Sequence, residues 1–461
     1  MKAVIMAGGH GTRIRSIASD IPKPMIPVCG KPVLEYQIEN LKECGITEII
    51  LVTGYLAESI HSYFGDGSRL GVHISYFREE TPLGTAGALF CLREQLQEDF
   101  LLLMGDLMIS VDFNRFMDFH RKRGGKATLF VHPNSHPYDS DIIVTSECGE
   151  AAEFSRELCK GPGARMLPAS MEDRRDRVLC VIGKKEERRE DYHNQVNAGI
   201  YALSPGALSE ISPAGPKIDL DREIIRPLIE KGEVYAYKST EYVKDMGTPD
   251  RYEEVTGAVE SGLVRRRNLA RPQKCIFMDR DGTINVEHGF LKDPERLELL
   301  PGAAEAIRKI NASPYLAVVI TNQPVIARGE CSFETLDKIH QRLERILGQE
   351  GAYLDGLLYC PHHPDAGFEG EIPDLKFACG CRKPAPGMIL EAFDRWHITP
   401  EGSWMIGDRT QDILCGLNAG LRTALVETGA AGKDGKYEAV PAFTAPDLLH
   451  AVEKILEDGC E

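Results

Sequence analysis

One interruption in the hydrophobic pattern constrains the fold of this chain more than any other feature. Up to about residue 260, short apolar runs, among them 3–6 and 101–104, alternate with amphipathic helical patterns such as 33–43. At 263–272 the pattern gives way to the basic, proline-ended stretch LVRRRNLARP. It then begins again, with strand patterns such as 275–278 alternating with helical ones. Alternation of this kind predicts a parallel sheet covered by helices in each half.

The length of the chain agrees with two separate units. A single hydrophobic core rarely organises more than ~250 to 300 residues, and this chain has 461. We therefore predict an α/β protein with a first domain at 1–262, a linker at 263–272 and a second α/β domain at 273–461. No repeat relates the two halves.

Charge and cysteine content narrow the classes of partner and compartment. A formal net charge of −16 argues against nucleic acid and acidic membranes, because both require a basic surface. No run approaches the ~18 apolar residues of a membrane span, and the first residues lack the pattern of a signal peptide. Thirteen scattered cysteines fit free thiols in a reducing compartment. We expect a cytoplasmic protein that acts on small molecules; its oligomeric state stays open, a homo-oligomer included.

The loop after the first expected strand combines glycines with cations. It reads Ala7-Gly8-Gly9-His10-Gly11-Thr12-Arg13, and Pro22-Lys23-Pro24 follows. Glycines directly after a strand let backbone N–H groups approach phosphate oxygens, while arginine and lysine neutralise their charge. A tight turn is the alternative interpretation of the glycines alone. The combination favours a phosphate site.

Further motifs follow in a fixed order across the first half. They are PLGTAG at 82–87, Gly105-Asp106, VNAGIY at 196–201 and DMGTP at 245–249. With the glycine loop they closely resemble the sugar-1-phosphate nucleotidyltransferases that make nucleotide sugars. The resemblance covers roughly the first 260 residues and implies a Rossmann-like domain with a mostly parallel sheet.

The resemblance implies a role for each motif. A sugar 1-phosphate oxygen attacks the α-phosphorus of a nucleoside triphosphate, pyrophosphate leaves, and the site must stabilise the developing charge. By resemblance, Arg13 and Lys23 hold the triphosphate and stabilise the transition state, while Asp106 and Asp245 bind Mg²⁺. An aspartate in a Gly-Asp turn is otherwise typical of a capped loop. The substrate-binding positions that the resemblance adds are Gly8, Gly9, Gly11, Thr12, Gly84, Thr85 and Asn197.

Two further substrate contacts are less well defined by the motifs: the lysine that binds the sugar phosphate and the residue that selects the base. Lys184 or Lys185 stands where the family places a lysine on the sugar phosphate, but the usual Glu-Lys-Pro context is absent and a solvated charged face is the alternative. Glu80 precedes PLGTAG where thymidylyl and uridylyl relatives carry glutamine. A carboxylate accepts two hydrogen bonds and so matches the donor edge of guanine, which favours GTP; a plain surface residue beside Glu79 is the alternative.

The second half opens with a pair of carboxylates at the end of an apolar strand, Asp279-Arg280-Asp281-Gly282-Thr283. Carboxylates at the carboxyl edge of a parallel sheet lie where open α/β sheets bind ligands. The D-x-D-G-T sequence, followed by Thr321-Asn322, Arg382-Lys383 and Gly407-Asp408, resembles the haloacid dehalogenase (HAD) superfamily over about residues 274–430.

This second resemblance implies a phosphatase with a covalent intermediate. Asp279 is then the nucleophile that forms an aspartyl phosphate, and Asp281 protonates the leaving oxygen before it activates water. Thr321 and Lys383 hold the phosphoryl oxygens, with Asn322 and Arg382 in the same phosphate-binding motifs. Mg²⁺ binds Asp279, Asp408 and the carbonyl oxygen of Asp281.

Two short chelating pairs lie between these motifs. Cys360 and His362 form the first pair, and Cys379 and Cys381 the second. One imidazole and three thiolates suit a closed tetrahedral Zn²⁺ site, and a disulfide is the alternative. His363 is left out as a ligand. The zinc loop narrows the resemblance to D-glycero-D-manno-heptose 1,7-bisphosphate phosphatases and their histidinol-phosphate relatives, although Pro324-Val325 replaces the usual Ser-Gly.

The two halves are chemically consecutive, because removal of the 7-phosphate from a heptose 1,7-bisphosphate leaves a sugar 1-phosphate. The resemblances therefore imply a bifunctional enzyme of nucleotide-activated heptose biosynthesis, with GTP as the expected donor. Two alternatives stay open. One is a mannose 1-phosphate guanylyltransferase fused to a phosphatase of other specificity, and the other is a non-catalytic regulatory protein.

Overall fold

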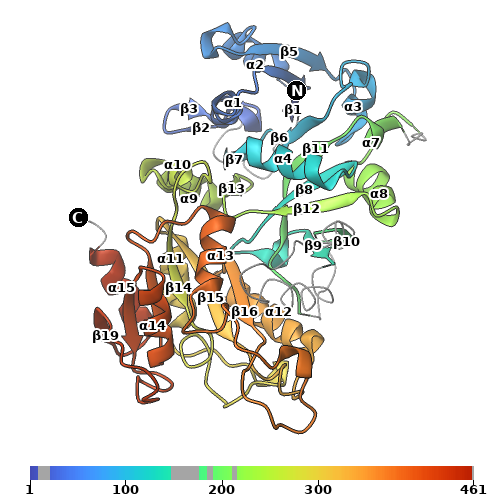
Figure 1. Ribbon diagram of the computed structural model, residues 1–461. Helices are drawn as coiled ribbons and strands as arrows, with labels where there is room; N and C mark the ends of the chain where they lie inside the picture. The colour runs from blue at the N-terminus through green and yellow to red at the C-terminus, as the bar shows by residue number, and fades with distance from the viewer. Residues whose placement is uncertain (9–20, 55, 147–175, 184–190, 210–214, 459–461) are drawn as a thin grey trace.

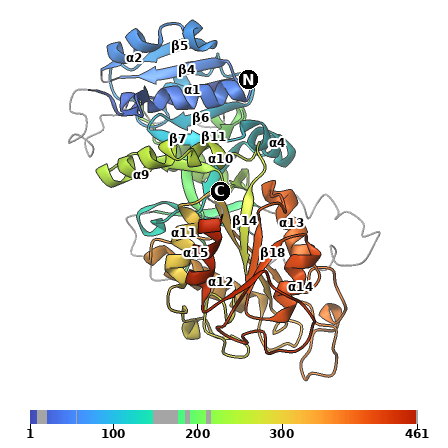
Figure 2. The same cartoon turned by 90° about the vertical axis from the view of Figure 1, so that its left-hand side faces the viewer.

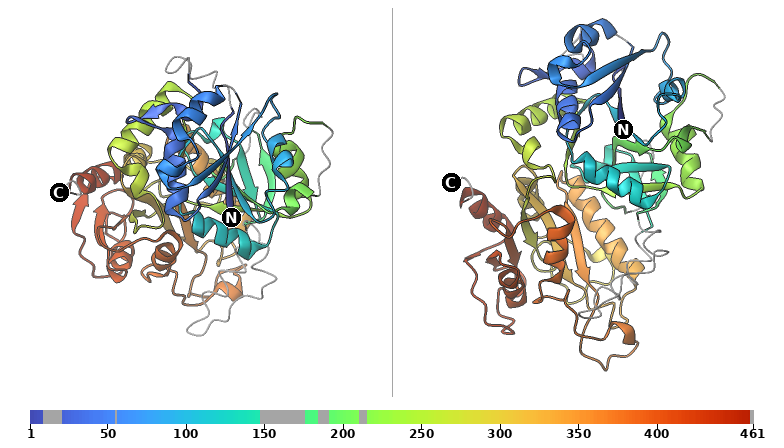
Figure 3. Two further views of the ribbon diagram at one scale, coloured as in Figure 1. Left: turned by 90° about the horizontal axis from the view of Figure 1, so that it is seen from above. Right: turned by 45° about the horizontal axis from the view of Figure 1, so that its top comes forward.

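The computed structural model describes residues 1–8, 21–54, 56–146, 176–183, 191–209 and 215–458. The chain forms two α/β units, one coloured blue to green and the other yellow to red in Figures 1 and 2. The tilted view of Figure 3 shows the first unit stacked on the second. The predicted fold class is confirmed in both halves.

The first unit is built on a nine-stranded sheet with the strand order β10-β9-β11-β6-β1-β4-β5, to which β8 and β12 are added through β11. Its strands are β1 (Lys2–Met6), β4 (Glu48–Thr53), β5 (His73–Arg78), β6 (Phe100–Met104), β8 (Ala127–His132), β9 (Ile142–Thr145), β10 (Val178–Ile182), β11 (Val196–Leu203) and β12 (Val234–Lys238). Two small sheets pair β2 (Pro27–Val28) with β3 (Lys31–Pro32), and β7 (Leu107–Ser110) with β13 (Tyr242–Asp245).

Helices cover both faces of this sheet. One apolar core contains residues of α1 (Val33–Glu43), α2 (Ala57–Phe64) and α4 (Phe113–Arg123). The other contains residues of α3 (Gly87–Leu92), α7 (Gly206–Ser209) and α8 (Arg226–Glu230). β1, β4, β5 and β6 pair in parallel, as a Rossmann-like unit requires, whereas β11 runs antiparallel to β6, β8 and β9.

The second unit is a six-stranded sheet in which every strand pair is parallel, with the order β16-β15-β14-β17-β18-β19. The strands are β14 (Lys274–Met278), β15 (Tyr315–Asn322), β16 (Gly356–Cys360), β17 (Trp404–Gly407), β18 (Arg422–Val426) and β19 (Phe443–Ala445). α11 (Ala303–Asn311), α12 (Phe333–Gln349) and α15 (Leu448–Asp458) contribute to the core on one face. α13 (Gly387–Trp396) and α14 (Thr410–Asn418) contribute to the other.

Helix starts follow local capping chemistry. The side chains of Asp112, Thr248 and Ser332 accept hydrogen bonds from backbone N–H groups in the first turns of α4, α9 (Pro249–Glu260) and α12. These donors have no partner within the helix, so a capping oxygen stabilises the start by ~1 kcal/mol. No helix in the described ranges is both long and apolar enough to cross a membrane.

The stretch predicted as the linker is packed between the units. It begins with the short helix α10 (Leu263–Arg266), which follows α9, and both helices lie between the two sheets (Figure 1). Arg267 is 4% exposed and forms a buried ion pair with Asp355, with 3.1 Å between the guanidinium and each carboxylate oxygen. It also donates to the carbonyl of Tyr315 at 2.7 Å. Arg267 therefore fixes the stretch to the second unit, while its other arginines, Arg265, Arg266 and Arg271, are exposed.

A buried carboxylate of the first unit also holds the stretch at 263–272. Glu241 accepts hydrogen bonds from the backbone N–H groups of Asp112 at 2.6 Å and Leu269 at 3.0 Å, and from the Ser239 hydroxyl at 2.9 Å. Burial raises the pKa of Glu241 to about 7, with the hydrogen bonds opposing the rise. The folded protein therefore keeps a proton that the unfolded chain releases near pH 4.5.

This pKa predicts a pH-dependent stability that Glu241→Gln removes. Since the folded state binds more protons between about pH 4.5 and 7, the free energy of unfolding of the wild type falls as the pH rises through that window, by up to about 3 kcal/mol. Glutamine keeps the accepting oxygen and can donate to Ser239, so the variant should match the wild type at pH 5 and exceed it at pH 8. Denaturant unfolding at both pH values measures the difference; equal differences at pH 5 and pH 8 would contradict the assignment.

Candidate active sites

The first cluster of charged groups lies where three loops of the first unit meet. Asp106 follows β6, and Lys23, in the short turn Lys23–Met25, forms an ion pair with it. Asp245 ends β13 and is opposite Leu107 in the β7–β13 pair, so this register places it beside the Asp106 loop. A Cβ atom at Gly105 would lie 2.8 Å from the carbonyl oxygen of Met6, which explains why glycine precedes Asp106.

A cation not singled out in the sequence analysis neutralises Asp245. Arg251, in the first turn of α9, donates to both oxygens of Asp245 at 2.9 and 3.0 Å. Burial favours the neutral carboxyl, but the charges of Arg251 and Lys23 outweigh it and hold the pKa of Asp245 below its usual value. Asp245 is therefore ionised at neutral pH. The only sequence signal for Arg251 was its place in the helical turn that follows the DMGTP motif.

The PLGTAG loop packs against a neighbouring segment. Gly84 has a positive φ of 83°, and a Cβ atom there would lie 2.3 Å from the carbonyl oxygen of Ile218. The Thr85 hydroxyl accepts a hydrogen bond from the backbone N–H of Leu220 at 2.7 Å. Both residues thus fix the position of the loop.

The remaining assignments in the first half fall partly outside the described residues. Asn197 accepts a hydrogen bond from the N–H of Gly199 at 3.1 Å and lines the same pocket as Asp106 and Asp245. Glu80 is exposed, whereas Glu79 is partly buried and close to Gly8. The predicted positions that lie outside the described residues are Gly9, Gly11, Thr12, Arg13, Lys184 and Lys185.

The second site gathers four charged side chains at the carboxyl edge of the parallel sheet. Asp279 follows β14 and Asp408 follows the neighbouring β17. The buried ammonium of Lys383 lies 2.8 Å from Asp279 and 2.7 Å from Asp412, and it donates to the carbonyl of Ile320. Oxygens of Asp279, Asp408 and Asp412 all lie within 4.8 Å of one another. Asp412, which the sequence analysis missed, comes from the first turn of α14.

The electrostatics of this cluster fit a divalent cation. Burial and the charges of Asp279 and Asp412 raise the pKa of Asp408 to about 8, and burial likewise raises that of Asp412 to about 7. One buried oxygen of Asp408, Oδ1, has no hydrogen-bond partner among the described residues. Carboxylate oxygens are the ligands that Mg²⁺ prefers. A Cβ atom at Gly282 would lie 2.6 Å from Asp408, so the D-x-D-G-T glycine makes room for this carboxylate.

Asp281 lies in its own hydrogen-bond network beside this cluster. Its carboxylate accepts hydrogen bonds from Arg280 at 2.8 Å, Asn285 at 2.9 Å and Gln323 at 2.9 Å. Burial opposes ionisation, but Arg280 and the other donors lower the pKa of Asp281. Arg280 is fully buried and also contacts His340 at 3.1 Å. None of the three donors was singled out in the sequence.

The other predicted phosphate-binding residues are held around Lys383 and Asp281. Gln323 donates to the buried hydroxyl of Thr321 at 2.9 Å. Asn322 exchanges two hydrogen bonds with the backbone of Lys383, at 3.0 and 3.1 Å. Arg382 donates to the carbonyl of His362 at 3.2 Å, which ties the phosphate motif to the cysteine loop.

The cysteine loop forms a compact group of potential metal ligands. The sulfurs of Cys360, Cys379 and Cys381 lie 3.3 to 3.5 Å apart, and Nδ1 of His362 lies 3.4 and 3.5 Å from two of them. A disulfide has its sulfurs about 2.05 Å apart, so these separations exclude a disulfide among the three cysteines. The four ligand atoms could hold one metal ion. His363 is not in this group.

Comparisons with known proteins find a matching family for each half of the chain. The nucleotidyl transferase family model matches residues 2–262, and the HAD-like hydrolase model matches 380–451. A D-glycero-β-D-manno-heptose-1,7-bisphosphate 7-phosphatase of Pasteurella multocida is 40% identical over 36% of this chain and 89% of its own length. A mannose-1-phosphate guanylyltransferase of Mycobacterium tuberculosis is 31% identical over 54% of this chain, which spans 62% of that protein.

A crystal structure of D,D-heptose 1,7-bisphosphate phosphatase from B. bronchiseptica, complexed with magnesium and phosphate, is 32% identical over 40% of this chain and 99% of its own, with a TM-score of 0.35. The family matches and the two sites together define a two-domain enzyme, a nucleotidyltransferase followed by a HAD-like phosphatase. The chain belongs to the nucleotidyl transferase family through its first half and to the heptose-bisphosphate 7-phosphatase family through its second.

Proposed function

We propose that the protein carries out two consecutive steps of nucleotide-heptose biosynthesis. Its second domain removes the 7-phosphate from D-glycero-D-manno-heptose 1,7-bisphosphate, and its first domain transfers a nucleotidyl group to the resulting heptose 1-phosphate. The buried Asp279, Asp408 and Lys383 cluster carries the proposal, because it provides a phosphatase site in the same chain as a nucleotidyltransferase that requires a sugar 1-phosphate.

In the phosphatase step, a carboxylate oxygen of Asp279 attacks phosphorus and forms an aspartyl phosphate. By family resemblance, Asp281 protonates the departing sugar oxygen and then removes a proton from the water that hydrolyses the intermediate. Because Arg280 and the other donors lower the pKa of Asp281, the carboxylate takes up this proton as the anionic phosphate ester binds beside it. Lys383 and Thr321 hold phosphoryl oxygens, while Asn322 positions Lys383. Mg²⁺ at Asp279, Asp408 and the Asp281 carbonyl would screen the repulsion between a carboxylate and an anionic phosphate. Asp412 also pairs with the Lys383 ammonium at 2.7 Å and so helps to position it.

In the transferase step, a phosphate oxygen of the sugar attacks the α-phosphorus and pyrophosphate leaves. Lys23, with Arg13 by family resemblance, neutralises the triphosphate, and Asp106 and Asp245 provide hard oxygen ligands for Mg²⁺. Gly84 and Thr85 hold the loop beside the nucleotide, and Asn197 faces the acceptor. Because no proton has to be removed from a phosphate anion, the site works by charge and position.

The proposed structural zinc and the proposed cytoplasmic location rest on the ligand chemistry and on the free cysteines. Three thiolates and one imidazole form a closed donor set typical of structural Zn²⁺, and free thiols agree with a cytoplasmic location. A mannose 1-phosphate guanylyltransferase fused to this phosphatase is a second candidate, favoured by the 31% identity of the first half to such an enzyme.

One experiment separates the two candidates. The full-length protein is incubated with Mg²⁺, each of GTP, ATP, UTP and dTTP, and either heptose 1,7-bisphosphate, heptose 1-phosphate or mannose 1-phosphate, and the products are identified by mass. The proposal expects a nucleotide-heptose from both heptose substrates and release of phosphate from the bisphosphate alone. Efficient transfer only to mannose 1-phosphate would favour the second candidate.

The donor base is expected to be guanine. A carboxylate beside the PLGTAG loop accepts from the N1–H and the amino group of guanine, whereas an amide accepts only at its oxygen. Glu80→Gln should therefore lower kcat/KM for GTP by about tenfold, the equivalent of one such hydrogen bond, with little change for ATP. Initial rates with the four triphosphates measure this, and Glu94→Gln, at an exposed position after α3, is the matched control. Wild-type use of ATP equal to that of GTP would remove the argument.

A further inference from the structure

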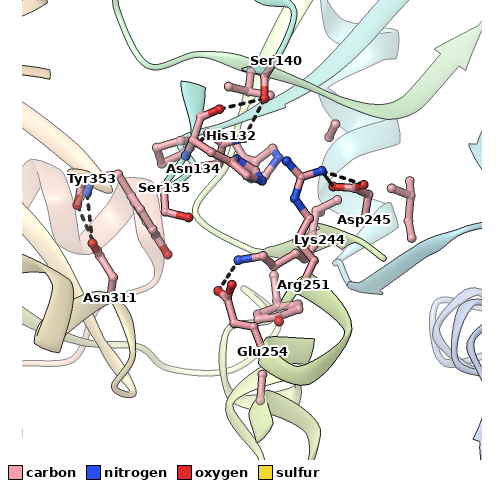
Figure 4. A pocket seen from close by; sticks show the side chains of 18 of the residues that line it. His132, Asn134, Ser135, Ser140, Lys244, Asp245, Arg251, Glu254, Asn311 and Tyr353 are labelled. Carbon is pink, nitrogen blue, oxygen red and sulfur yellow. Dashed lines mark hydrogen bonds and ion pairs between the residues drawn. The ribbon is translucent and has the colours of Figure 1, made fainter. Parts of the chain in front are cut away.

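A cavity of about 660 Å³ lies between the two domains and joins groups from both. It extends from Asp106 and Asp245 of the first domain to Asn311 and Tyr353 of the second. Figure 4 shows Asp245 and Arg251 on one side of this pocket and Tyr353 with Asn311 on the opposite side. The volume is in the range of ~300 to 1,000 Å³ that small-molecule sites occupy.

The first end of the pocket is charged. Asp106 and Asp245 lie there with Arg251, and Lys244 forms an ion pair with Glu254. Carboxylates that can bind a cation, next to fixed cations, suit the phosphate end of a sugar phosphate. An acceptor bound for in-line attack would place its phosphate at this end and its sugar in the rest of the cavity.

Polar groups that carry no charge at neutral pH also line the pocket. Asn134, Ser135 and His136 lie along it. Burial, with the charges of Arg251 and Lys244, lowers the pKa of His136 to about 4, so its ring is neutral. Both ring nitrogens of His136 are buried from solvent, so the ring contributes an uncharged wall. The Ser135 hydroxyl, which Figure 4 shows among the pocket side chains, offers a donor and an acceptor that match sugar hydroxyls.

The far wall comes from the phosphatase domain. Tyr353 precedes β16, and Figure 4 shows its ring extending toward the pocket. Asn311, at the end of α11, holds the Tyr353 backbone through two hydrogen bonds, to its carbonyl at 2.9 Å and from its N–H at 3.0 Å. Within the described parts of the chain, no hydrogen bond uses the Tyr353 hydroxyl. A fixed loop thus presents an aromatic ring and a hydroxyl at the end of the cavity.

We propose that the phosphatase domain completes the acceptor pocket of the transferase: Tyr353 contacts the end of the sugar farthest from its phosphate and favours a seven-carbon over a six-carbon sugar 1-phosphate. The inference rests on the proposed function. Its basis is a single cavity that is lined by the charged groups around Asp245, by uncharged polar groups, and by a wall from the other domain that includes Tyr353 and Arg308.

Tyr353 lies well apart from the phosphatase chemistry within its own domain. Asp279 follows β14 and Asp408 follows β17, whereas Tyr353 precedes β16, and all strands of this sheet are parallel. The phosphatase site and the pocket wall are therefore at opposite edges of the sheet. Hydrolysis of the bisphosphate serves as an internal control for a change at Tyr353.

The test compares acceptors in the full-length enzyme. Tyr353→Phe removes only the hydroxyl, and loss of one hydrogen bond should lower the transferase kcat/KM for heptose 1-phosphate by about tenfold. The value for mannose 1-phosphate should change little, because its shorter side chain leaves the wall uncontacted. Tyr353→Ala should reduce the heptose preference further, and phosphatase rates should stay at the wild-type level in both variants. Tyr138→Phe, at a 59% exposed position outside the pocket lining, is the matched control.

The outcomes separate this inference from the function on which it rests. A heptose-to-mannose preference unchanged in both Tyr353 variants would overturn the inference while leaving the bifunctional assignment intact. An equal loss with both acceptors would also overturn it, since Tyr353 would then support the fold of the pocket rather than the sugar end. A wild-type protein that transfers to mannose 1-phosphate but to no heptose 1-phosphate would contradict the proposed function itself.

Discussion

Asp279→Asn should abolish phosphatase activity, with a loss of several orders of magnitude, and leave nucleotidyl transfer to supplied heptose 1-phosphate near the wild-type rate. Asparagine keeps the shape of the side chain but cannot form the acyl phosphate, and loss of a covalent nucleophile has effects of this size. The first domain keeps Lys23, Asp106 and Asp245. Phosphate release and nucleotide-heptose formation, measured separately, give the two rates.

Asp106→Asn should produce the reverse pattern, because it weakens the cation site of the first domain alone. With the bisphosphate as the only sugar, each variant should fail to make nucleotide-heptose, and a mixture of the two should restore it through free intermediate. If Asp279→Asn also abolishes transfer to the monophosphate in a folded protein, the two sites are not independent.

Cys381→Ser should release one zinc ion per chain and destabilise the second domain. Structural zinc contributes an apparent binding free energy of ~10 to 16 kcal/mol in small peptides, and three of the four ligand atoms come from thiols here. Phosphatase activity should fall with zinc content, because Arg382 and Lys383 directly follow Cys381 and Arg382 donates to the carbonyl of His362. Metal analysis with thermal unfolding measures both effects.

The matched control is Cys331→Ser, which changes a cysteine of the same domain outside the ligand group. This variant should keep its zinc. Active wild-type protein without zinc would show that the cluster does not need the metal.

The elements of the fold were largely predictable because apolar periodicity is a local signal. The helical pattern at 33–43 coincides with α1, and the strand patterns at 101–104 and 275–278 lie within β6 and β14. The antiparallel course of β11 was not apparent, since strand direction depends on partners distant in the sequence. The burial of Arg267 was missed for the same reason, because its partner Asp355 lies 88 residues further on.

In the candidate sites, too, residues in local motifs could be predicted, whereas residues that depend on distant partners could not. Asp279 and Asp408 could be predicted because ordered motifs mark them, and the sheet places them side by side. Asp412 and Arg251 could not, since each lies in the first turn of a helix and acts through a partner that only the fold brings close. The contribution of Tyr353 to the interdomain cavity had no sequence signal, because a pocket between domains depends on how both are packed.

The buried pair of Arg267 and Asp355 decides where this chain can be divided into two separately produced proteins. A phosphatase fragment that starts at the predicted boundary, residue 273, would lack Arg267 and leave Asp355 in the interior without its cation. Breaking a buried pair from one side costs ~3 to 5 kcal/mol, a large share of the ~5 to 15 kcal/mol that stabilises a typical domain. The division therefore has to be made on the N-terminal side of Arg267, so that most of the stretch predicted as a linker stays with the phosphatase.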